Sequence, residues 1–257
     1  MRHLLRLAYR GTAYHGWQRQ PHATSVQAVI EGVLATVCRA PVALTGCGRT
    51  DAGVHASDYA AHFELAGELP PDLLRRANRL LPPDIALRSV APTRLHARFD
   101  ATHRAYRYDL TGRKDPFRVG QVWAYHAFAK LDPARLNAAA SSLLDYGAFA
   151  PFCKTHSDAR TMRCDLRRSE WVVAAADPDT GAPAELHYHV AADRFLRGMV
   201  RLIVGACVQH ALGRLTLAEI RDALAAQAPL PRPLSVPGDG LYLTEVRYGD
   251  GDSLAGP

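Results

Sequence analysis

The order of strand-like and helix-like patterns is the feature of this 257-residue chain that most constrains its fold. Alternating apolar residues predict strands, whereas apolar residues at three- and four-residue spacing predict helices. These segments mix along the chain without the strict strand–helix alternation that a doubly wound parallel sheet requires. The pattern therefore predicts an α+β fold in which helices pack beside a mostly antiparallel sheet.

The predicted elements run through the whole chain. Strands are predicted at residues 3–10, 42–47, 58–65, 85–90, 104–110, 166–175, 186–192 and 241–248. Helices are predicted at residues 26–37, 70–81, 133–144 and 196–207, with a last helix after residue 216. Thr24 with Gln27, and Thr216 with Glu219, match the capping-box pattern at the start of the first and last helices.

The chain is predicted to have two halves, residues 1–97 and residues 98–248. No low-complexity linker separates them, so a shared sheet or a tight interface is expected. Residues 249–257 are expected to form a frayed tail.

Positive charge is concentrated in arginine. The formal net charge is +6, and lysine occurs only at positions 114, 130 and 154. A basic chain fits an anionic partner such as nucleic acid, although many soluble proteins carry this charge without one. Arg197 and Arg201, one turn apart on the predicted long helix, are expected to project together. The arginines gather in three stretches: Arg94, Arg98, Arg104, Arg107, Arg113 and Arg118; Arg160, Arg163, Arg167 and Arg168; and Arg194, Arg197 and Arg201.

The cysteine and histidine patterns do not predict a metal site or a disulfide framework. The five cysteines include no Cys-x-x-Cys pair. His187 and His189 would share one face of a strand, but no Cys or carboxylate recurs at ligand spacing, so no metal is expected. No stretch approaches the length needed to span a bilayer, and the first residues are too short and too charged for a secretory signal. A cytoplasmic location without a membrane partner is expected.

One glycine-bracketed loop carries the strongest candidate for chemistry. Asp51 lies between Gly48 and Gly53, with Arg49 and His55 on either side. A carboxylate in this setting could be a nucleophile or general base, a metal ligand, or a turn residue, since Asp is common in turns. The local chemistry leaves these three readings open.

The octapeptide GRTDAGVH at residues 48–55 resembles the signature of the tRNA pseudouridine synthase A family. Other segments similar to family landmarks follow in family order over nearly the whole chain, which makes a chance match untenable. They are Tyr9-Arg10-Gly11, Tyr14-His15-Gly16-Trp17-Gln18-Arg19-Gln20, Asn78-Arg79-Leu80-Leu81-Pro82-Pro83-Asp84-Ile85, His96-Ala97-Arg98-Phe99-Asp100-Ala101-Thr102, Tyr106-Arg107-Tyr108, Phe195, Met199-Val200-Arg201, Ile203-Val204-Gly205 and Gly240-Leu241-Tyr242-Leu243 with Val246 and Tyr248.

The resemblance implies a pseudouridine synthase fold, with two similar α/β-sandwich (ferredoxin-like) halves sharing a mostly antiparallel sheet. It also implies an isomerase that converts uridine to pseudouridine at positions 38, 39 and 40 in the anticodon stem-loop of tRNAs. Asp51 matches the catalytic aspartate, Tyr106 the tyrosine that lies against the target base, and Arg201 the arginine that pairs with the aspartate. Arg49 and His55 are expected to bind substrate. Family members are homodimers that bind tRNA; the reaction needs no cofactor, and no DNA partner is expected.

Several residues keep a plainer interpretation when they are considered alone. Tyr106 could be a core residue of an alternating strand, and Arg201 an exposed arginine at the edge of a helix. Tyr14, His15, Trp17 and Arg19 could form part of an RNA surface, but Trp17 could equally be core. One departure from the family follows the octapeptide, where a Gly-Gln pair is common and this chain has Asp58-Tyr59.

Two other functions are alternatives for a chain with this sequence. A catalytically silent tRNA-binding or folding protein could share the fold, but it would not need Asp51, Tyr106 and Arg201 together. A magnesium-dependent phosphotransferase would need a second carboxylate placed to share the metal, or a glycine-rich loop with a lysine. Neither motif is apparent in the sequence.

Overall fold

The computed structural model describes residues 1–155 and 159–249. The chain divides into two compact units, Met1–His103 with Tyr242–Pro257, and Arg104–Leu241. The strand predicted at residues 241–248 therefore belongs almost entirely to the first unit. The division predicted from the sequence assigns it to the second half, residues 98–248. Of the predicted tail, the residues from 250 onward lie outside the described part of the chain.

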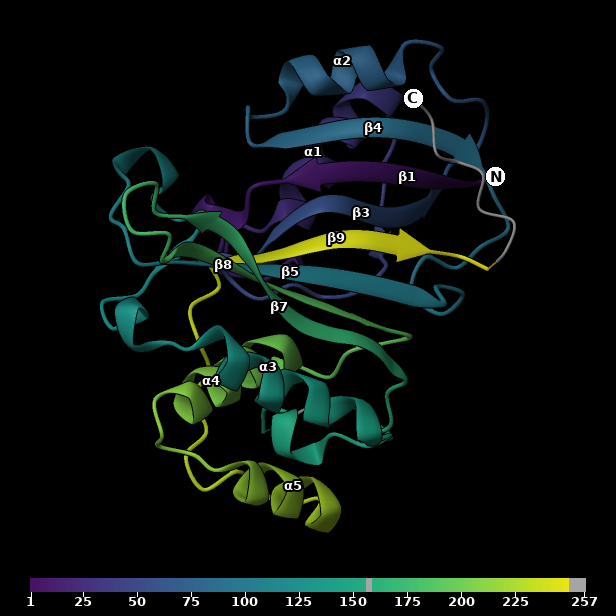
Figure 1. Ribbon diagram of the computed structural model, residues 1–257. Coiled ribbons are helices and arrows are strands. Elements are labelled where there is room, and N and C mark those ends of the chain that lie inside the picture. Colours follow the sequence, from purple (N-terminus) through teal and green to yellow (C-terminus); the bar gives the residue numbers. More distant parts are fainter. Residues whose placement is uncertain (156–158, 250–257) are drawn as a thin grey trace. The chain divides into compact units, whose positions relative to one another are not determined.

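The first unit contains a mostly antiparallel sheet in the order β4-β1-β3-β9 (Figure 1), and the short β2 pairs with β3. β1 pairs antiparallel with both β3 and β4, whereas β9 runs parallel to β3. Its elements are β1 (Arg2–Tyr9), the short 3-10 helix η1 (Gly11–Ala13), α1 (Val26–Cys38), β2 (Thr45–Gly46), β3 (His55–Glu64), α2 (Leu73–Leu80), β4 (Ile85–Pro92) and β9 (Leu241–Arg247).

Helix α1 forms where the apolar spacing predicts it, but its N-terminus differs from the prediction. The residue that caps it is Ser25, whose side chain accepts a backbone N–H from the first turn. The predicted capping box of Thr24 and Gln27 is therefore wrong. The Gln27 side chain instead donates to the carbonyl of Leu44, which ties the helix to the strand that follows.

The second unit contains an antiparallel sheet in the order β5-β8-β7, with the short β6 parallel to β5. Helix α3 packs against both α4 and β7. The elements are β5 (His103–Thr111), β6 (Trp123–Ala124), α3 (Pro133–Ser141), β7 (Leu166–Ala176), β8 (Pro183–Ala192), α4 (Met199–Ala211) and α5 (Leu217–Ala226), with 3-10 helices η2 (Pro116–Arg118), η3 (Phe128–Lys130), η4 (Ser142–Asp145) and η5 (Ala150–Phe152). The α+β class and the mostly antiparallel pairing are thus confirmed in both units.

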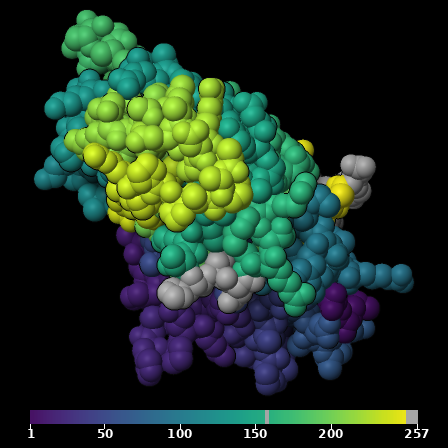
Figure 2. Space-filling model, turned by 90° about the horizontal axis from the view of Figure 1, so that it is seen from below, coloured from purple at the N-terminus to yellow at the C-terminus, as the bar shows by residue number. Residues whose placement is uncertain are grey.

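Alternation along the strands of the second unit separates a buried face from a polar one. Tyr108 on β5 and Tyr188 on β8 pair in register and are fully buried. Arg107 and His187, each one position away, belong to the opposite, polar face. In Figure 2 the turn that joins β7 and β8, residues 177–182, projects from the surface in green.

Helix α4 starts later than the periodicity predicts. Gly198 is its N-cap and has a left-handed backbone conformation with φ of 69°, which ends the helical pattern read back to residue 196. Arg197 therefore precedes the helix and Arg201 lies in its first turn, so the prediction that both project from one helix is wrong. The capping box of Thr216 and Glu219 on α5 is confirmed. Among the described residues, none of the helices combines the length and apolarity needed to cross a membrane.

Candidate active site

The loop that carries Asp51 joins β2 to β3 in the first unit. The backbone N–H of Val54 donates to the carbonyl of Asp51 at 3.2 Å, which closes a tight turn. Gly53 within this turn has φ of 77°, a conformation that glycine adopts without steric cost. The Asp51 side chain is half-buried, so the turn presents a carboxylate at the edge of the folded unit rather than in open solvent.

The opening segment of the chain holds this loop through backbone hydrogen bonds. The N–H of Gly53 donates to the carbonyl of Tyr14, and the N–H of Trp17 donates to the carbonyl of Thr50. The Thr50 hydroxyl is also bonded to the Tyr9 hydroxyl at 2.8 Å. Residues on both sides of Asp51 are thus fixed to the N-terminal strand and the loop that follows it.

Two glycines allow this close approach of the opening segment. A Cβ on Gly11 would lie 2.0 Å from the carbonyl oxygen of Val54. A Cβ on Gly16 would lie 2.5 Å from the carbonyl oxygen of Thr50, and Gly16 also has φ of +92°. Only glycine fits at these positions, because any side chain would displace the backbone around Asp51.

The structure decides the open question about the aromatic residues of the opening segment. The Trp17 ring is 2 % exposed and stacks on Tyr59, with ring centroids 4.1 Å apart. Tyr14 is buried, and its hydroxyl donates to Asp84. His15 is exposed, so in this segment the core interpretation holds for Trp17 and the surface one for His15.

The departure at Asp58-Tyr59 has a structural explanation in the first unit. The Tyr59 hydroxyl donates to the carbonyl of Gly48, at the start of the loop that carries Asp51. Asp58 accepts from the Arg6 guanidinium and from the backbone N–H of Val246 on β9. Burial raises the pKa of the Asp58 carboxyl, and the positive charge of Arg6 opposes that shift. The Asp58 carboxylate therefore stabilises the sheet by linking Arg6 on β1 to Val246 on β9.

His55 and Arg49 occupy contrasting environments. The His55 ring is 1 % exposed, stacks on Tyr242, and accepts the backbone N–H of Gly11 through Nδ1. Its surroundings suit a residue that holds the loop in place. Arg49, two residues before Asp51, is exposed.

Tyr106 lies on β5 in the second unit and is half-buried. Its ring meets that of Phe195 edge to face, with centroids 5.1 Å apart and an interplanar angle of 89°. Phe195 comes from the loop between β8 and α4, so the contact sets the Tyr106 ring against a separate segment. In the sequence, Phe195 matches a family landmark, but no role was predicted for it. Its position shortly after the strand predicted at residues 186–192 is the feature that could have suggested one.

Arg201 lies in the first turn of α4 and is half-buried. Its Nε donates to the carbonyl of Val236 at 2.6 Å, and the N–H of Val236 donates to the carbonyl of Arg201. These bonds fix the arginine against the segment that leads into β9. Tyr106 and Arg201 thus belong to the second unit, and Asp51, Arg49 and His55 belong to the first.

Several arginines of the first two predicted stretches form ion pairs with acidic side chains. Within strands, an arginine and a carboxylate two residues apart project from the same face and can pair. This reduces the free positive charge that the sequence alone suggests for an RNA surface. The pairs among described residues of the second unit include Arg107–Asp109, Arg113–Asp177, Arg118–Glu185, Arg167–Asp165 and Arg168–Glu170.

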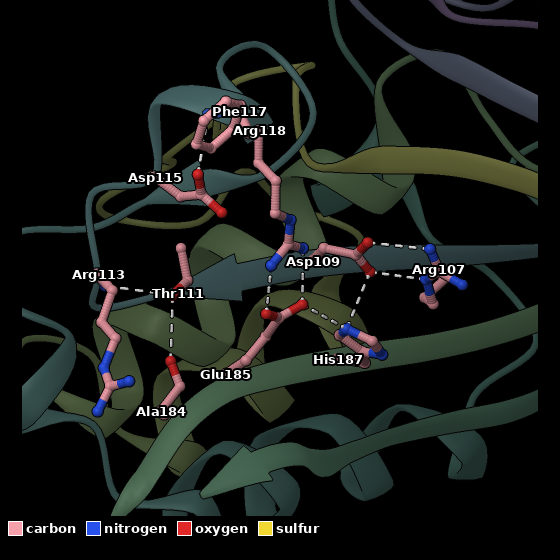
Figure 3. A network of polar contacts seen from close by, with 10 residues as sticks. All are labelled: Arg107, Asp109, Thr111, Arg113, Asp115, Phe117, Arg118, Ala184, Glu185 and His187. Atoms are coloured by element: carbon pink, nitrogen blue, oxygen red, sulfur yellow. Dashed lines mark hydrogen bonds and ion pairs between the residues drawn. The ribbon is translucent and has the colours of Figure 1, made fainter. Parts of the chain in front are cut away.

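Within the described residues, one cluster has the composition of a metal site (Figure 3). Asp109, Glu185 and His187 offer ligand atoms within 4.8 Å of one another. Arg107 donates two hydrogen bonds to Asp109, and Arg118 donates two to Glu185. The hydrogen bonds from Arg118 lower the pKa of the Glu185 carboxyl to about 2. Since each carboxylate is already paired with a guanidinium, this donor set forms a charge network on the polar face of the sheet.

Comparison with known proteins identifies the family of the chain. A family model described as tRNA pseudouridine synthase matches residues 139–249. The chain is 42 % identical to the tRNA pseudouridine synthase A of Porphyromonas gingivalis over 252 residues, which cover 96 % of this chain and 97 % of the other. It is 41 % identical over 251 residues to the protein of that name from Bacteroides thetaiotaomicron, with 96 % and 90 % covered.

A less similar relative also matches over most of its length. The tRNA pseudouridine synthase A of Nostoc sp. is 37 % identical over 248 residues, covering 94 % of this chain and 84 % of the other. Similarity at this level over nearly the full length, in which the loop of Asp51 and the segments of Tyr106 and Arg201 all lie, extends well beyond a single motif. The chain belongs to the tRNA pseudouridine synthase A family.

Proposed function

We propose that this chain is a cytoplasmic isomerase that converts uridine to pseudouridine at positions 38, 39 and 40 of the anticodon stem-loop of tRNAs. The observation that carries the proposal is full-length similarity to tRNA pseudouridine synthases, 42 % identity over 96 % of the chain. The rigid loop around Asp51 supports it, because covalent or acid–base catalysis requires a reacting group that is already in position.

Asp51 is the catalytic residue in this proposal. Its carboxylate acts at the ribose of the target uridine, as a nucleophile or as a base. The bond between ribose and base breaks, the uracil turns, and a carbon–carbon bond to the same ribose replaces the original bond. Reactant and product are isomers, so the step consumes no oxidant, reductant or ATP.

The other site residues take roles that follow from the resemblance and fit their surroundings. Tyr106 stacks on the uracil, and Arg201 pairs with the Asp51 carboxylate and keeps it ionised. Arg49, which is exposed, binds RNA near the target nucleotide, whose extrusion from a stem costs a few kcal/mol. His55 acts on the substrate indirectly, through the loop that it holds at Gly11.

The decisive experiment uses unmodified tRNA with uridines in the anticodon arm, in buffer without added metal. Pseudouridine is measured by chemical labelling and primer extension. Wild-type protein should give stops at positions 38 to 40, whereas Asp51→Asn should fall below about one thousandth of the wild-type rate. Asp145→Asn, which removes a charge from an exposed position, is the matched control and should behave as wild type.

A catalytically silent tRNA-binding or folding protein is the alternative. It would bind tRNA but form no pseudouridine, and wild-type protein and Asp51→Asn would then give the same traces. The proposal also includes a homodimer in which one tRNA contacts both subunits. Light scattering in solution should therefore give twice the mass of one chain, and a monomeric mass would contradict that part.

A further inference from the structure

We propose that Tyr108 is a positioning residue for the isomerisation and that it acts through Arg201. Its hydroxyl holds the backbone of residues 234–240, and this 234–240 segment in turn holds the Arg201 guanidinium. The inference rests on the proposed function, which gives Arg201 its role at the Asp51 carboxylate. All the contacts that carry it lie within the second unit.

The 234–240 segment follows α5 and precedes β9 along the chain, and it forms neither helix nor strand. It is nevertheless in close contact with regular elements at both ends. A Cβ on Gly205 of α4 would lie 1.8 Å from the carbonyl oxygen of Leu234. At the other end, the N–H of Asp109 on β5 donates to the carbonyl of Gly240 at 2.8 Å. The segment is therefore fixed to both α4 and β5.

The middle of the 234–240 segment holds Arg201. The Nε of Arg201 donates to the carbonyl of Val236 at 2.6 Å, and the N–H of Val236 donates to the carbonyl of Arg201 at 3.4 Å. A guanidinium is planar, so a hydrogen bond at Nε restricts the orientation of the whole group. The position of the Val236 carbonyl therefore influences the direction in which the Arg201 guanidinium faces.

Tyr108 holds the next carbonyl of the same segment. Its hydroxyl donates to the carbonyl of Pro237 at 3.0 Å. The ring is fully buried and meets that of Trp123 edge to face, with centroids 6.2 Å apart. Burial raises the pKa of the Tyr108 hydroxyl, although the positive charge of Arg201 opposes the shift, so the hydroxyl remains a donor at neutral pH.

Proline at position 237 links the two carbonyls mechanically. The peptide bond before Pro237 is planar, and the proline ring fixes φ at about −65°. Only one backbone angle, ψ of Pro237, can therefore turn between the carbonyl that Tyr108 holds and the one that Arg201 uses. Loss of the Tyr108 hydrogen bond would release both carbonyls, and the acceptor of the Arg201 Nε–H would no longer be fixed.

Tyr108→Phe tests the proposal, because it removes the hydroxyl and keeps the ring. Pseudouridine formation by full-length protein is measured in single-turnover reactions over a range of protein concentrations. The maximal rate should fall about tenfold, because the guanidinium is no longer held in one orientation. The concentration that gives half the maximal rate should change by less than about twofold, since no contact with tRNA is removed.

Tyr188→Phe is the matched control. Tyr188 pairs in register with Tyr108 and is equally buried, and its hydroxyl is bonded to Ser169 on β7 at 2.7 Å, away from the 234–240 segment. Both variants lose one buried hydroxyl, so both should unfold at a lower temperature than wild type. Tyr188→Phe should keep the wild-type rate. Equal rates for the two variants would show that the loss is one of stability alone and would overturn the proposal.

The effect of the Tyr108 hydroxyl should depend on Arg201. Arg201→Lys keeps the positive charge but lacks the Nε–H. In this background, Tyr108→Phe should change the rate by less than about twofold, because both substitutions break the same chain of contacts. The same tenfold loss in both backgrounds would mean that Tyr108 acts by another route, and the proposal would be wrong.

A further measurement needs no activity. In protein with isotope-labelled arginine, NMR follows the exchange of the Arg201 Nε–H with water, and the Arg201→Lys protein identifies its signal. Tyr108→Phe should accelerate this exchange about fivefold, whereas Tyr188→Phe should not. Unchanged exchange in Tyr108→Phe would refute the hold on Arg201. Wild-type protein that forms no pseudouridine would contradict the proposed function, and the exchange rates would still decide whether Tyr108 positions Arg201.

Discussion

The His55 ring accepts the backbone N–H of Gly11 through Nδ1 at a distance of 3.0 Å. One partner is the last residue of the octapeptide that contains Asp51, and the other is the first residue of η1, which follows β1. A neutral ring in this arrangement carries its proton on Nε2, because Nδ1 is the acceptor. The bond is one of the contacts through which the N-terminal segment sets the position of the loop that carries Asp51, the proposed catalytic residue.

Replacing His55 by leucine should therefore destabilise the protein by about 1–3 kcal/mol, because the Gly11 N–H would lose its acceptor in a buried place. His55→Asn keeps an acceptor at the matching position and should recover part of the loss. Urea unfolding measures both values. Equal stability of the two variants would contradict the role assigned to the bond.

Gly16 and Gly67 provide a matched test of the close approach beside Asp51. Both have φ near +90°, but a Cβ on Gly16 would collide with the carbonyl of Thr50, and one on Gly67 would meet nothing within 4 Å. Gly67→Ala should cost about 1–2 kcal/mol from backbone strain alone and leave pseudouridine formation unchanged. Gly16→Ala should cost more and reduce kcat at least tenfold, since Thr50 must move. A kcat for Gly16→Ala equal to that of Gly67→Ala would show that the loop tolerates the displacement.

Sequence patterns predicted the kind of each main element better than its ends. The pattern from Thr24 to Gln27 satisfies the capping-box rule, but Ser25 lies between them and caps α1, a choice that depends on where the chain enters the helix. The apolar spacing from residue 196 onward looks continuous, and only the left-handed backbone of Gly198 interrupts it. Arg197 consequently lies before the helix, and the apolar periodicity of the sequence could not predict this.

The pairing partner of the closing strand also could not be predicted from local sequence patterns. β9 was predicted as a strand, but its parallel pairing with β3 joins residues far apart along the chain. Similarly, the family motif identified Asp51 as the candidate nucleophile or base, but not the hydrogen bonds that hold it. Those hydrogen bonds depend on glycines such as Gly11 and Gly16. The need for glycine is seen only in the structure, where a Cβ at either position would collide with the backbone of the loop that carries Asp51.

The pair of Arg118 and Glu185 predicts a specific loss of stability in acid. A carboxyl whose pKa is lower in the folded than in the unfolded protein stabilises the fold above the unfolded value, about 4.3. That contribution is lost as the pH falls toward about 2, the folded value for Glu185. Glu185→Gln should therefore lower the free energy of unfolding at pH 7 by about 1 kcal/mol, allowing for solvent screening.

The difference between Glu185→Gln and wild type should shrink as the pH falls from about 4.3 toward about 2, because the Glu185 carboxyl of wild type is protonated first in the unfolded protein and only near pH 2 in the folded one. Urea unfolding at several pH values measures it. Glu68→Gln, which alters an exposed carboxylate in the first unit, should follow the wild-type curve throughout. A constant difference between Glu185→Gln and wild type across this range would refute the assigned ion pair.

The edge-to-face contact between Tyr106 and Phe195 predicts a coupling that can be measured in both stability and catalysis. Phe195→Leu preserves most of the apolar volume but removes the aromatic edge, so a double-mutant cycle with Tyr106→Leu should give about 0.5–1.5 kcal/mol. If Tyr106 stacks on the uracil as proposed, Phe195→Leu should also lower kcat/KM for tRNA about tenfold, because a Tyr106 ring that is free to tilt no longer presents a fixed face to the base. Phe117→Leu is the control, since Phe117 lies in the same unit and is 89 % exposed. If both variants reduce kcat/KM equally, the loss reflects a general effect of removing an aromatic residue and Phe195 does not orient Tyr106.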